Sequence, residues 1–309
     1  MLVCLSYFFL SRVEVYRGGE YLLLRERDSR CRLRVICKDQ PGIIKSVSEF
    51  LFLHDANIVE SNQYTSEDDN LFFMRIEFEI PSVGSLIYRL RSEFAEIADR
   101  FVMDYHFELS NRRKQLVIFV SREEHCLREL LWQWEIGHLH ADIRMVISNH
   151  DDARFLVESL GIPFHYLPVR PDTKAMIEEK QLNLIGKQVD FIVLARYMQI
   201  LSPHFLAAFP NRIINIHHSF LPAFVGCNPY EQAYHRGVKL IGATAHYVTE
   251  ELDEGPIIEQ QVLRVSHRDS VHDLKRIGQN VERSTLFQAV KWHVEDRILV
   301  HRNKTIVLV

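Results

Sequence analysis

The chain has 309 residues, of which 47% are hydrophobic and 25% are charged, and its formal net charge is −4. This length suits two domains with buried cores, and the charge gives no footprint for binding nucleic acid. The cysteines are odd in number and form no C-x-x-C pair, which argues against a disulfide framework and a structural zinc site. We therefore expect a globular protein of the reducing cytoplasm.

The first 29 residues are predicted to be an extension, to which we assign no function. Residues 1–10 are apolar, but no basic region precedes them and no small-residue cleavage site follows, so the pattern does not indicate a signal peptide. The run is also too short to span a bilayer, and no other segment is apolar enough. The sequence therefore predicts no association with a membrane.

Residues 30–110 show the pattern of a ferredoxin-like β-α-β-β-α-β domain. Polar and apolar residues alternate where strands are expected, apolar residues recur at helical spacing between them, and the polar segment 67–70 suits a hairpin turn. The expected elements are a strand at 32–37, a helix from 43 to 54, strands at 57–65 and 71–80, a helix through 86–97, and a strand at 101–109.

After a short basic linker, residues 115–309 predict a Rossmann-like domain with a mostly parallel sheet. Five short apolar runs are separated by helix-like stretches, which is typical of a doubly wound α/β fold. The runs are 116–120, 143–148, 163–166, 191–194 and 213–216. Further strands are expected at 241–249 and 257–265, a helix with a Ser270–Asp273 capping box from 270 to about 295, and an edge strand at 305–309.

Asn215, His217 and Asp253 form the most informative pattern. Residues 212–216 suit a short buried strand, so the first two are expected just beyond its carboxyl end, where open sheets bind ligands. An asparagine amide can donate to a developing oxyanion, a histidine can donate to it or protonate a leaving nitrogen, and an aspartate can orient water. This set suits the transfer of an acyl group. An isolated Asn-x-His is more often a turn with a hydrogen-bonded histidine, so the surrounding residues decide.

Residues 212–260 resemble the folate-dependent formyltransferase family, whose signature is Asn-x-His at a strand end followed by Asp-x-Gly. The matching stretches are 215–222, 242–248 and 252–255, in the family's order. Residues 38–43 resemble the first loop of an ACT domain. The combination is similar to the formyltetrahydrofolate deformylase family. It implies hydrolysis of 10-formyltetrahydrofolate to formate and tetrahydrofolate, formate supply for purine biosynthesis, and no cofactor beyond this substrate.

The loop after the first strand of the second domain distinguishes a hydrolase from a transferase. Transferases of this family carry a glycine-rich loop there, whose backbone N–H groups hold the acceptor's phosphate. This chain has Ser-Arg-Glu-Glu-His-Cys at 121–126, and two carboxylates without glycine make a poor phosphate site. Water is then the expected acceptor. A transferase that uses an amine acceptor, and an inactive sensor of folate or amino acids, stay open as alternatives.

The resemblance also implies binding residues, and it places the folate against two loops. The expected folate contacts are Met198, Gln199, Ile200, Leu201, Val248, Thr249, Glu250 and Leu252, and Thr244 and His246 are expected to support the active site. Because relatives often carry arginine where Gln199 stands, Arg196 is considered for the folate's glutamate tail. His217 and His218 lack a third ligand at suitable spacing, so no metal is expected.

An ACT domain implies oligomers that bind an amino acid between subunits. Glycine or methionine is the effector that the resemblance suggests, and a homo-oligomer formed through the ACT domains is expected. The matching effector positions are Asp39, Gln40, Pro41, Gly42, Ile43 and Asn57. From the residues alone, Pro41 and Gly42 suit a simple turn from strand to helix.

Overall fold

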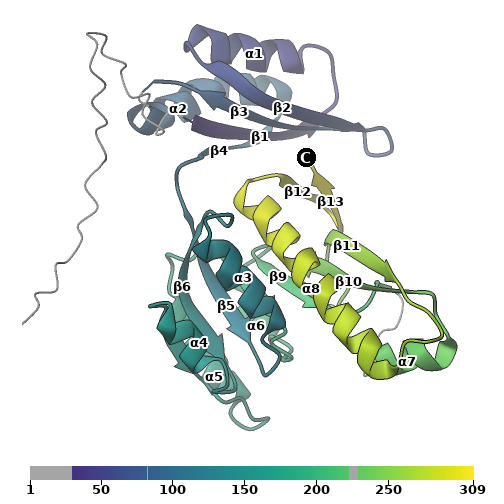
Figure 1. Cartoon of the computed structure of the whole chain (residues 1–309). Helices are drawn as coiled ribbons and strands as arrows, with labels where there is room; N and C mark the ends of the chain where they lie inside the picture. The colour runs from purple at the N-terminus through teal and green to yellow at the C-terminus, as the bar shows by residue number, and fades with distance from the viewer. Residues whose placement is uncertain (1–29, 82, 223–228) are drawn as a thin grey trace, which may run out of the picture.

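The computed structural model describes residues 30–81, 83–222 and 229–309. It contains an N-terminal unit (residues 30–109) and a C-terminal unit (residues 114–309), each built on its own β-sheet (Figure 1). The extension expected at residues 1–29 lies outside the described residues. None of the described helices is long and apolar enough to cross a membrane.

The N-terminal unit has the predicted β-α-β-β-α-β order. Its four strands are antiparallel and lie in the order β2-β3-β1-β4. The strand expected from Phe101 was wrong at its start, because that residue still belongs to the preceding helix and packs in the core. The elements are β1 (Arg30–Lys38), α1 (Ile43–Leu53), β2 (Asn57–Ser66), β3 (Leu71–Glu79), α2 (Val83–Phe101) and β4 (Asp104–Leu109).

The C-terminal unit has the predicted mostly parallel sheet, with strand order β11-β10-β9-β8-β5-β6-β7. Strands β5 to β9 are parallel, and β10 and β11 continue the sheet antiparallel. The elements are β5 (Lys114–Val120), α3 (His125–Glu135), β6 (Ala141–Ser148), α4 (Arg154–Ser159), β7 (Phe164–Tyr166), α5 (Lys174–Ile185), β8 (Phe191–Ala195), α6 (Pro203–Ala207), β9 (Ile213–His217), α7 (Pro229–Arg236), β10 (Leu240–Tyr247), β11 (Ile257–Arg264), α8 (Val271–Val294), β12 (Ile298–His301) and β13 (Lys304–Val307).

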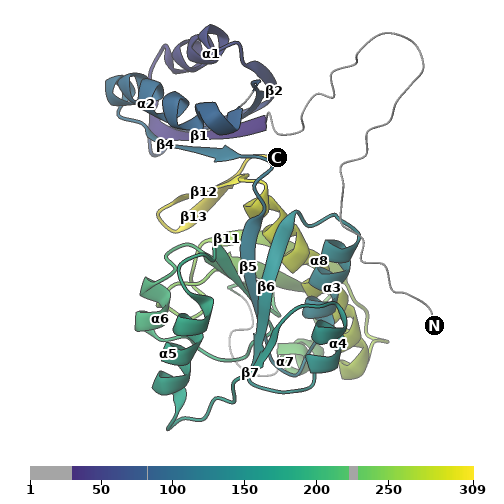
Figure 2. The same ribbon diagram turned by 90° about the vertical axis from the view of Figure 1, so that its left-hand side faces the viewer.

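Helices cover both faces of this sheet (Figure 2). Alternate residues of β5 show the two cores: Ile118 packs in the cluster that includes α3, α4 and α8, whereas Phe119 packs in the cluster that includes α5 and α6. The capping box predicted at Ser270 and Asp273 begins α8, and its side-chain and backbone hydrogen bonds satisfy N–H groups of the first turn. The central strands β8 and β9 are therefore buried on both sides, as their apolar sequences require.

The last strand corrects the sequence-based expectation. Residues 305–309 were expected at an edge of the main sheet, but β13 pairs only with β12 in a separate hairpin. This hairpin lies between the two units (Figures 1 and 2), and its Leu299 packs with Leu308 and with Phe73 of β3. The apolar side chains of the hairpin and of β3 bury one another. This burial accounts for the position of the hairpin against the N-terminal sheet.

Cations of the N-terminal unit surround the carboxyl end of α8. Arg75, which is only 1% exposed, donates two hydrogen bonds to the carbonyl oxygen of Glu295, and Arg32 donates to that of Val294. The unsatisfied carbonyls at a helix carboxyl end carry partial negative charge, so these contacts are favourable. Asp296 then pairs with Lys114 at 2.5 Å and with Arg32 at 3.3 Å.

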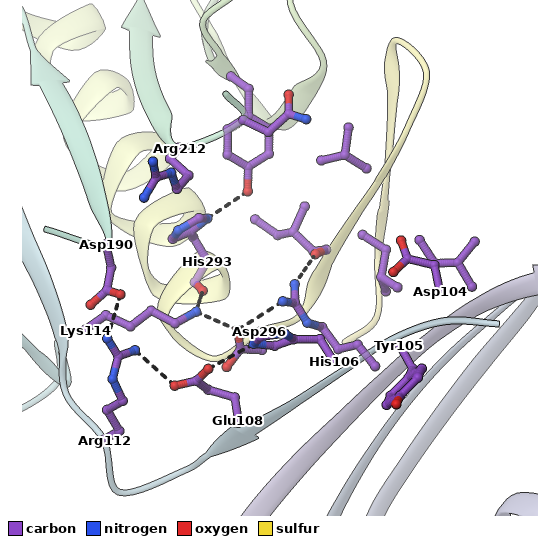
Figure 3. Close-up of a pocket in the computed structure, with 17 residues that line it drawn as sticks. Asp104, Tyr105, His106, Glu108, Arg112, Lys114, Asp190, Arg212, His293 and Asp296 are labelled. Atoms are coloured by element: carbon purple, nitrogen blue, oxygen red, sulfur yellow. Dashed lines mark hydrogen bonds and ion pairs between the residues drawn. The ribbon is translucent and has the colours of Figure 1, made fainter. Parts of the chain in front are cut away.

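A pocket of about 450 Å³ lies between β1 and β4 of the N-terminal unit and the starts of β5, β8 and β9 (Figure 3). Several of the labelled side chains that line it form ion pairs with one another. Lys114 pairs with Asp296, and Arg112 pairs with Asp190. None of the residues predicted to be catalytic lines it. The predicted catalytic residues therefore lie elsewhere in the C-terminal unit.

Candidate functional site

The pairing of β9 with β10 places the predicted residues on one face of the sheet. Asn215 lies opposite His246, and His217 lies opposite Thr244. Directly opposed residues of antiparallel strands project from the same face. Asn215 and His217 are the third and fifth residues of β9 itself, which corrects the expectation that they follow the strand. The continued ladder with β10 extends β9 through His217 and fixes both side chains on rigid backbone.

Asp253 reaches this face from the loop between β10 and β11. Its own φ is +58°, a left-handed backbone conformation. Two residues later Gly255 comes so close to β10 that an added Cβ would lie 1.8 Å from the carbonyl oxygen of Tyr247. The backbone of Tyr247 also donates to the carbonyl of Pro256. The Asp-x-Gly pattern thus has a steric cause, since only glycine lets the loop turn back with the aspartate inward.

Two histidines converge on the Asp253 carboxylate. His217 Nδ1 lies 3.1 Å from one carboxylate oxygen, and His246 Nε2 lies 3.6 Å from the other. Burial raises the pKa of Asp253, but the hydrogen bonds and charge of His217 and His246 outweigh it and hold the pKa well below its ordinary value. Asp253 is therefore an ionised hydrogen-bond acceptor at physiological pH.

Hydrogen bonding assigns a direction to each group. His246 Nδ1 lies 3.0 Å from the carbonyl oxygen of Tyr247 and therefore carries a proton, and its Nε2 lies 3.2 Å from the Asn215 amide nitrogen and 3.6 Å from Asp253. Asn215 keeps a second amide N–H. His217 directs Nδ1 to Asp253, and its Nε2 is buried without a hydrogen-bond partner. The site thus offers one amide donor and one ring nitrogen to a substrate.

Thr244, expected to support the active site, forms hydrogen bonds with the loop that follows β9. Its hydroxyl donates to the carbonyl of Ser219, and it accepts from the backbone N–H of Leu221 and the side chain of Gln260. Thr244 is fully buried, so these contacts occupy it. It holds the chain that leaves His217 and contributes no free group to the site.

The loops expected to bind folate follow β8 and β10. Leu194 of β8 pairs with Asn215, so residues 196–201 leave the sheet beside His217. Met198 and Ile200 are mostly exposed, whereas Leu201 is only 6% exposed and packs in the core on the α5 and α6 side. The structure therefore gives Leu201 a packing role.

The second loop runs along the same core. Val248 is half-buried against that cluster, and its backbone donates to the carbonyl of Ile213. Thr249 donates its hydroxyl to the carbonyl of Glu251, Glu250 is exposed, and Leu252 is 59% exposed. Exposed apolar side chains thus stand in both loops, next to the polar face of β9.

The structure does not bring the expected effector positions together within one chain. Lys38 pairs with Leu71, whereas Asn57 pairs with Glu79, so the loop at 39–43 and Asn57 lie at opposite ends of the N-terminal sheet. Gly42 has φ +97°, which explains why glycine begins α1. Asp39, Gln40 and Pro41 are exposed, and Ile43 is buried in the core.

Among the described residues, His125, Cys126 and Glu282 form a group whose ligand atoms lie within 4.8 Å of one another. Burial raises the pKa of the Cys126 thiol, as does the nearby carboxylate of Glu282. That carboxylate already accepts from His125 and Tyr230. A protonated thiol beside an occupied carboxylate is a poor metal site.

Sequence reasoning missed the buried polar contacts of this region. Arg196, considered for the folate tail, is only 7% exposed and points to Glu123 and Glu282. The sequence did contain one sign of these contacts, which is that Glu282 lies on the apolar face of α8. Buried residues such as Gly278 and Leu286 flank it at helical spacing. A buried carboxylate requires partners, but the pattern does not name them.

Comparison with known proteins agrees with this architecture. Residues 32–95 match the ACT domain family, and residues 114–290 match the formyl transferase family. The chain is 55% identical over 302 residues to the formyltetrahydrofolate deformylase of Bacillus subtilis (strain 168), covering 97% of this chain and 98% of that protein.

Solved structures give the same answer. A formyltetrahydrofolate deformylase from Pseudomonas syringae pv. tomato is 46% identical, with a TM-score of 0.87 over 92% of this chain and 96% of that one. Glycinamide ribonucleotide transformylase 1 from Symbiobacterium toebii is 30% identical, with a TM-score of 0.60 over 66% of this chain and 97% of that one. The second likeness covers too little of this chain to include both units. With both units matched, the chain belongs to the formyltetrahydrofolate deformylase family.

Proposed function

We propose that this chain hydrolyses 10-formyltetrahydrofolate to formate and tetrahydrofolate, and so balances the one-carbon folate pool and supplies formate for purine biosynthesis. The observation that carries the proposal is the arrangement of Asp253, His217 and Asn215, in which a buried ring nitrogen without a partner stands near an amide donor. The names of the relatives support the substrate.

The geometry supports a sequence of proton transfers. Water adds to the formyl carbon, and the Asn215 amide donates to the oxygen that gains negative charge. His217 Nε2 takes a proton from the water and returns it to the leaving nitrogen as the carbon–nitrogen bond breaks. Asp253 holds the imidazole through Nδ1, and its remaining lone pairs accept from the attacking water. Its low pKa makes the aspartate an orienting acceptor and leaves proton transfer to His217.

Formate release in the absence of any amine tests the reaction. Incubation of the pure protein with 10-formyltetrahydrofolate should give formate and tetrahydrofolate in equal amounts. Turnover that requires an added amine acceptor would favour a formyltransferase, and tight folate binding without turnover would favour an inactive sensor.

Replacement of Asn215 by alanine should lower kcat by about 10² to 10³, or roughly 3 to 4 kcal/mol, because the oxyanion loses its donor. Steady-state kinetics with a thermal unfolding curve measure this effect. Asn183→Ala, on the exposed side of α5, is the matched control and should leave kcat unchanged. Near-normal turnover in Asn215→Ala would contradict the role of this side chain.

We further propose that the folate lies against the loops at 198–201 and 248–252, that residues 30–110 form the regulatory domain, and that residues 115–309 form the catalytic one. The position of both loops beside β9 supports the first point.

We propose a homo-oligomer formed through the N-terminal unit. Because Gly42 and Asn57 are separated within one chain, a second copy would have to complete an amino-acid site for glycine or methionine. Buried free thiols, such as Cys31, support a reducing cytoplasm.

A further inference from the structure

The sheet of the C-terminal unit has its topological switch point between β5 and β8. From β5 the chain proceeds to β6 and β7 on one side, and then returns to β8 and β9 on the other. The helices that follow β5 and β8, which are α3 and α6, pack on opposite faces of the sheet. This opens a crevice at the carboxyl ends of the two strands. Open α/β sheets bind ligands in this crevice, and here it adjoins the end of β9, which carries the catalytic residues.

In this protein an ion pair lies at the carboxyl ends of these two strands. Glu123 follows β5, Arg196 follows β8, and Arg196 Nη2 donates to a Glu123 carboxylate oxygen at 2.9 Å. The other carboxylate oxygen of Glu123 lies 3.1 Å from Lys275 Nζ of α8. The contacts join the two strand ends that would otherwise border an open site.

A second carboxylate closes the crevice from the side of α8. Glu282 is 1% exposed, and one of its oxygens lies 2.8 Å from His125 Nε2 and 3.4 Å from Arg196 Nε. Its other oxygen accepts from the Tyr230 hydroxyl at 2.6 Å. The formal charges of Glu123, Arg196, Lys275 and Glu282 cancel, so the cluster has no excess of cations for an anionic ligand.

Arg196 occupies its position at a structural cost. Its φ is +62°, a conformation that glycine adopts without strain. Its Nη1 atom is buried without a hydrogen-bond partner, and its Nε atom has only the ion-pair contact with Glu282 at 3.4 Å. A strained, partly unsatisfied side chain that persists in the fold indicates a role for that side chain.

We propose that the Glu123–Arg196–Glu282 cluster determines the acceptor by filling the switch-point crevice, so that a phosphate-bearing amine cannot bind and water alone reaches the formyl group. This inference rests on the proposed hydrolysis and explains its acceptor. Two carboxylates repel a phosphate, and the guanidinium that would attract it is already paired. Glu123 and Arg196 are specificity residues, and neither is placed in contact with the reacting atoms.

Binding of phosphoribosylglycinamide, measured by calorimetry without folate, tests the cluster directly. We expect no detectable binding to the unmodified protein, and binding to the double variant Glu123→Gly with Arg196→Gly that is at least about tenfold tighter than the detection limit, because removing both partners opens the crevice and leaves Lys275 free. With 10-formyltetrahydrofolate added, this variant should also yield formylated amine beside formate. The unmodified protein should yield formate alone.

Glu124→Gly is the matched control, because Glu124 forms its ion pair with Arg128 on the surface of α3 and its loss leaves the Glu123–Arg196–Glu282 cluster in place. Glu123→Gln removes one negative charge without removing bulk, and a smaller gain in binding is expected from it. Binding of the amine to the unmodified protein would overturn the proposal, and so would a folded double variant that binds it no better than Glu124→Gly. The binding measurement needs no turnover, so failure of hydrolysis is recorded separately.

Discussion

Replacement of Asp253 by asparagine is expected to lower kcat by about 10³-fold or more, with the affinity for folate little changed. Asp253 is an ionised acceptor that holds His217 Nδ1 at 3.1 Å. In the proposed reaction, the imidazole becomes a cation when Nε2 takes the proton from water, and the adjacent carboxylate stabilises this cation. An amide has the same size but no charge, so it removes this stabilisation.

Single-turnover and steady-state measurements of formate release separate the loss in kcat from any change in KM. Glu254→Gln is the matched control, since this exposed carboxylate is the next residue of the same loop. It should stay within about twofold of the unmodified protein. A change in Asp253→Asn that is confined to KM would mean that Asp253 binds substrate without supporting the chemistry.

Replacement of Asp296 by asparagine is expected to lower the free energy of unfolding at neutral pH by about 3 to 5 kcal/mol. Asp296 is only 3% exposed and pairs with Lys114 at 2.5 Å and with Arg32 at 3.3 Å, across the junction of the two units. The substitution leaves these cations without their partner. Burial already lowers the pKa of Lys114, so it would lose its proton more readily.

The same substitution should change the response to acid. Burial raises the pKa of Asp296, but Lys114, Arg34 and Arg32 outweigh it and lower the pKa from 3.8 to about 2. A folded-state pKa below the unfolded value stabilises the fold above about pH 4, and this contribution is lost as pH falls through about 2. The difference in unfolding free energy between the unmodified protein and the variant should therefore shrink by about 2 kcal/mol over this range.

Urea unfolding at several pH values measures both effects. Asp99→Asn, an exposed aspartate at the end of α2, is the control and should change stability by less than about 0.5 kcal/mol. An equal loss of unfolding free energy in both variants would show that Asp296 affects stability only through the net charge of the protein and not through its ion pairs.

Local patterns were sufficient for the fold class and for the order of the elements. Alternation along β1, with its interior positions buried on one side, and the wholly buried β8 follow directly from residue type and spacing. The predictions were wrong where contacts with residues distant in the sequence decide where an element begins or with which strand it pairs. Phe101 stays helical because it packs in the N-terminal core, and β13 leaves the main sheet because Leu308 packs with Phe73.

The candidate site divides in the same way. The sequence by itself determined the local features that predict Asn215, His217 and Asp253 as the site, which are a short strand, its end and the Asp-x-Gly turn. The family resemblance gave this prediction a chemistry. Only the tertiary structure decided that His246 orients Asn215 and that Arg196 joins Glu123 to Glu282. Buried charges and rings acquire partners through strand register and helix packing over long chain separations, and no local pattern specifies those contacts.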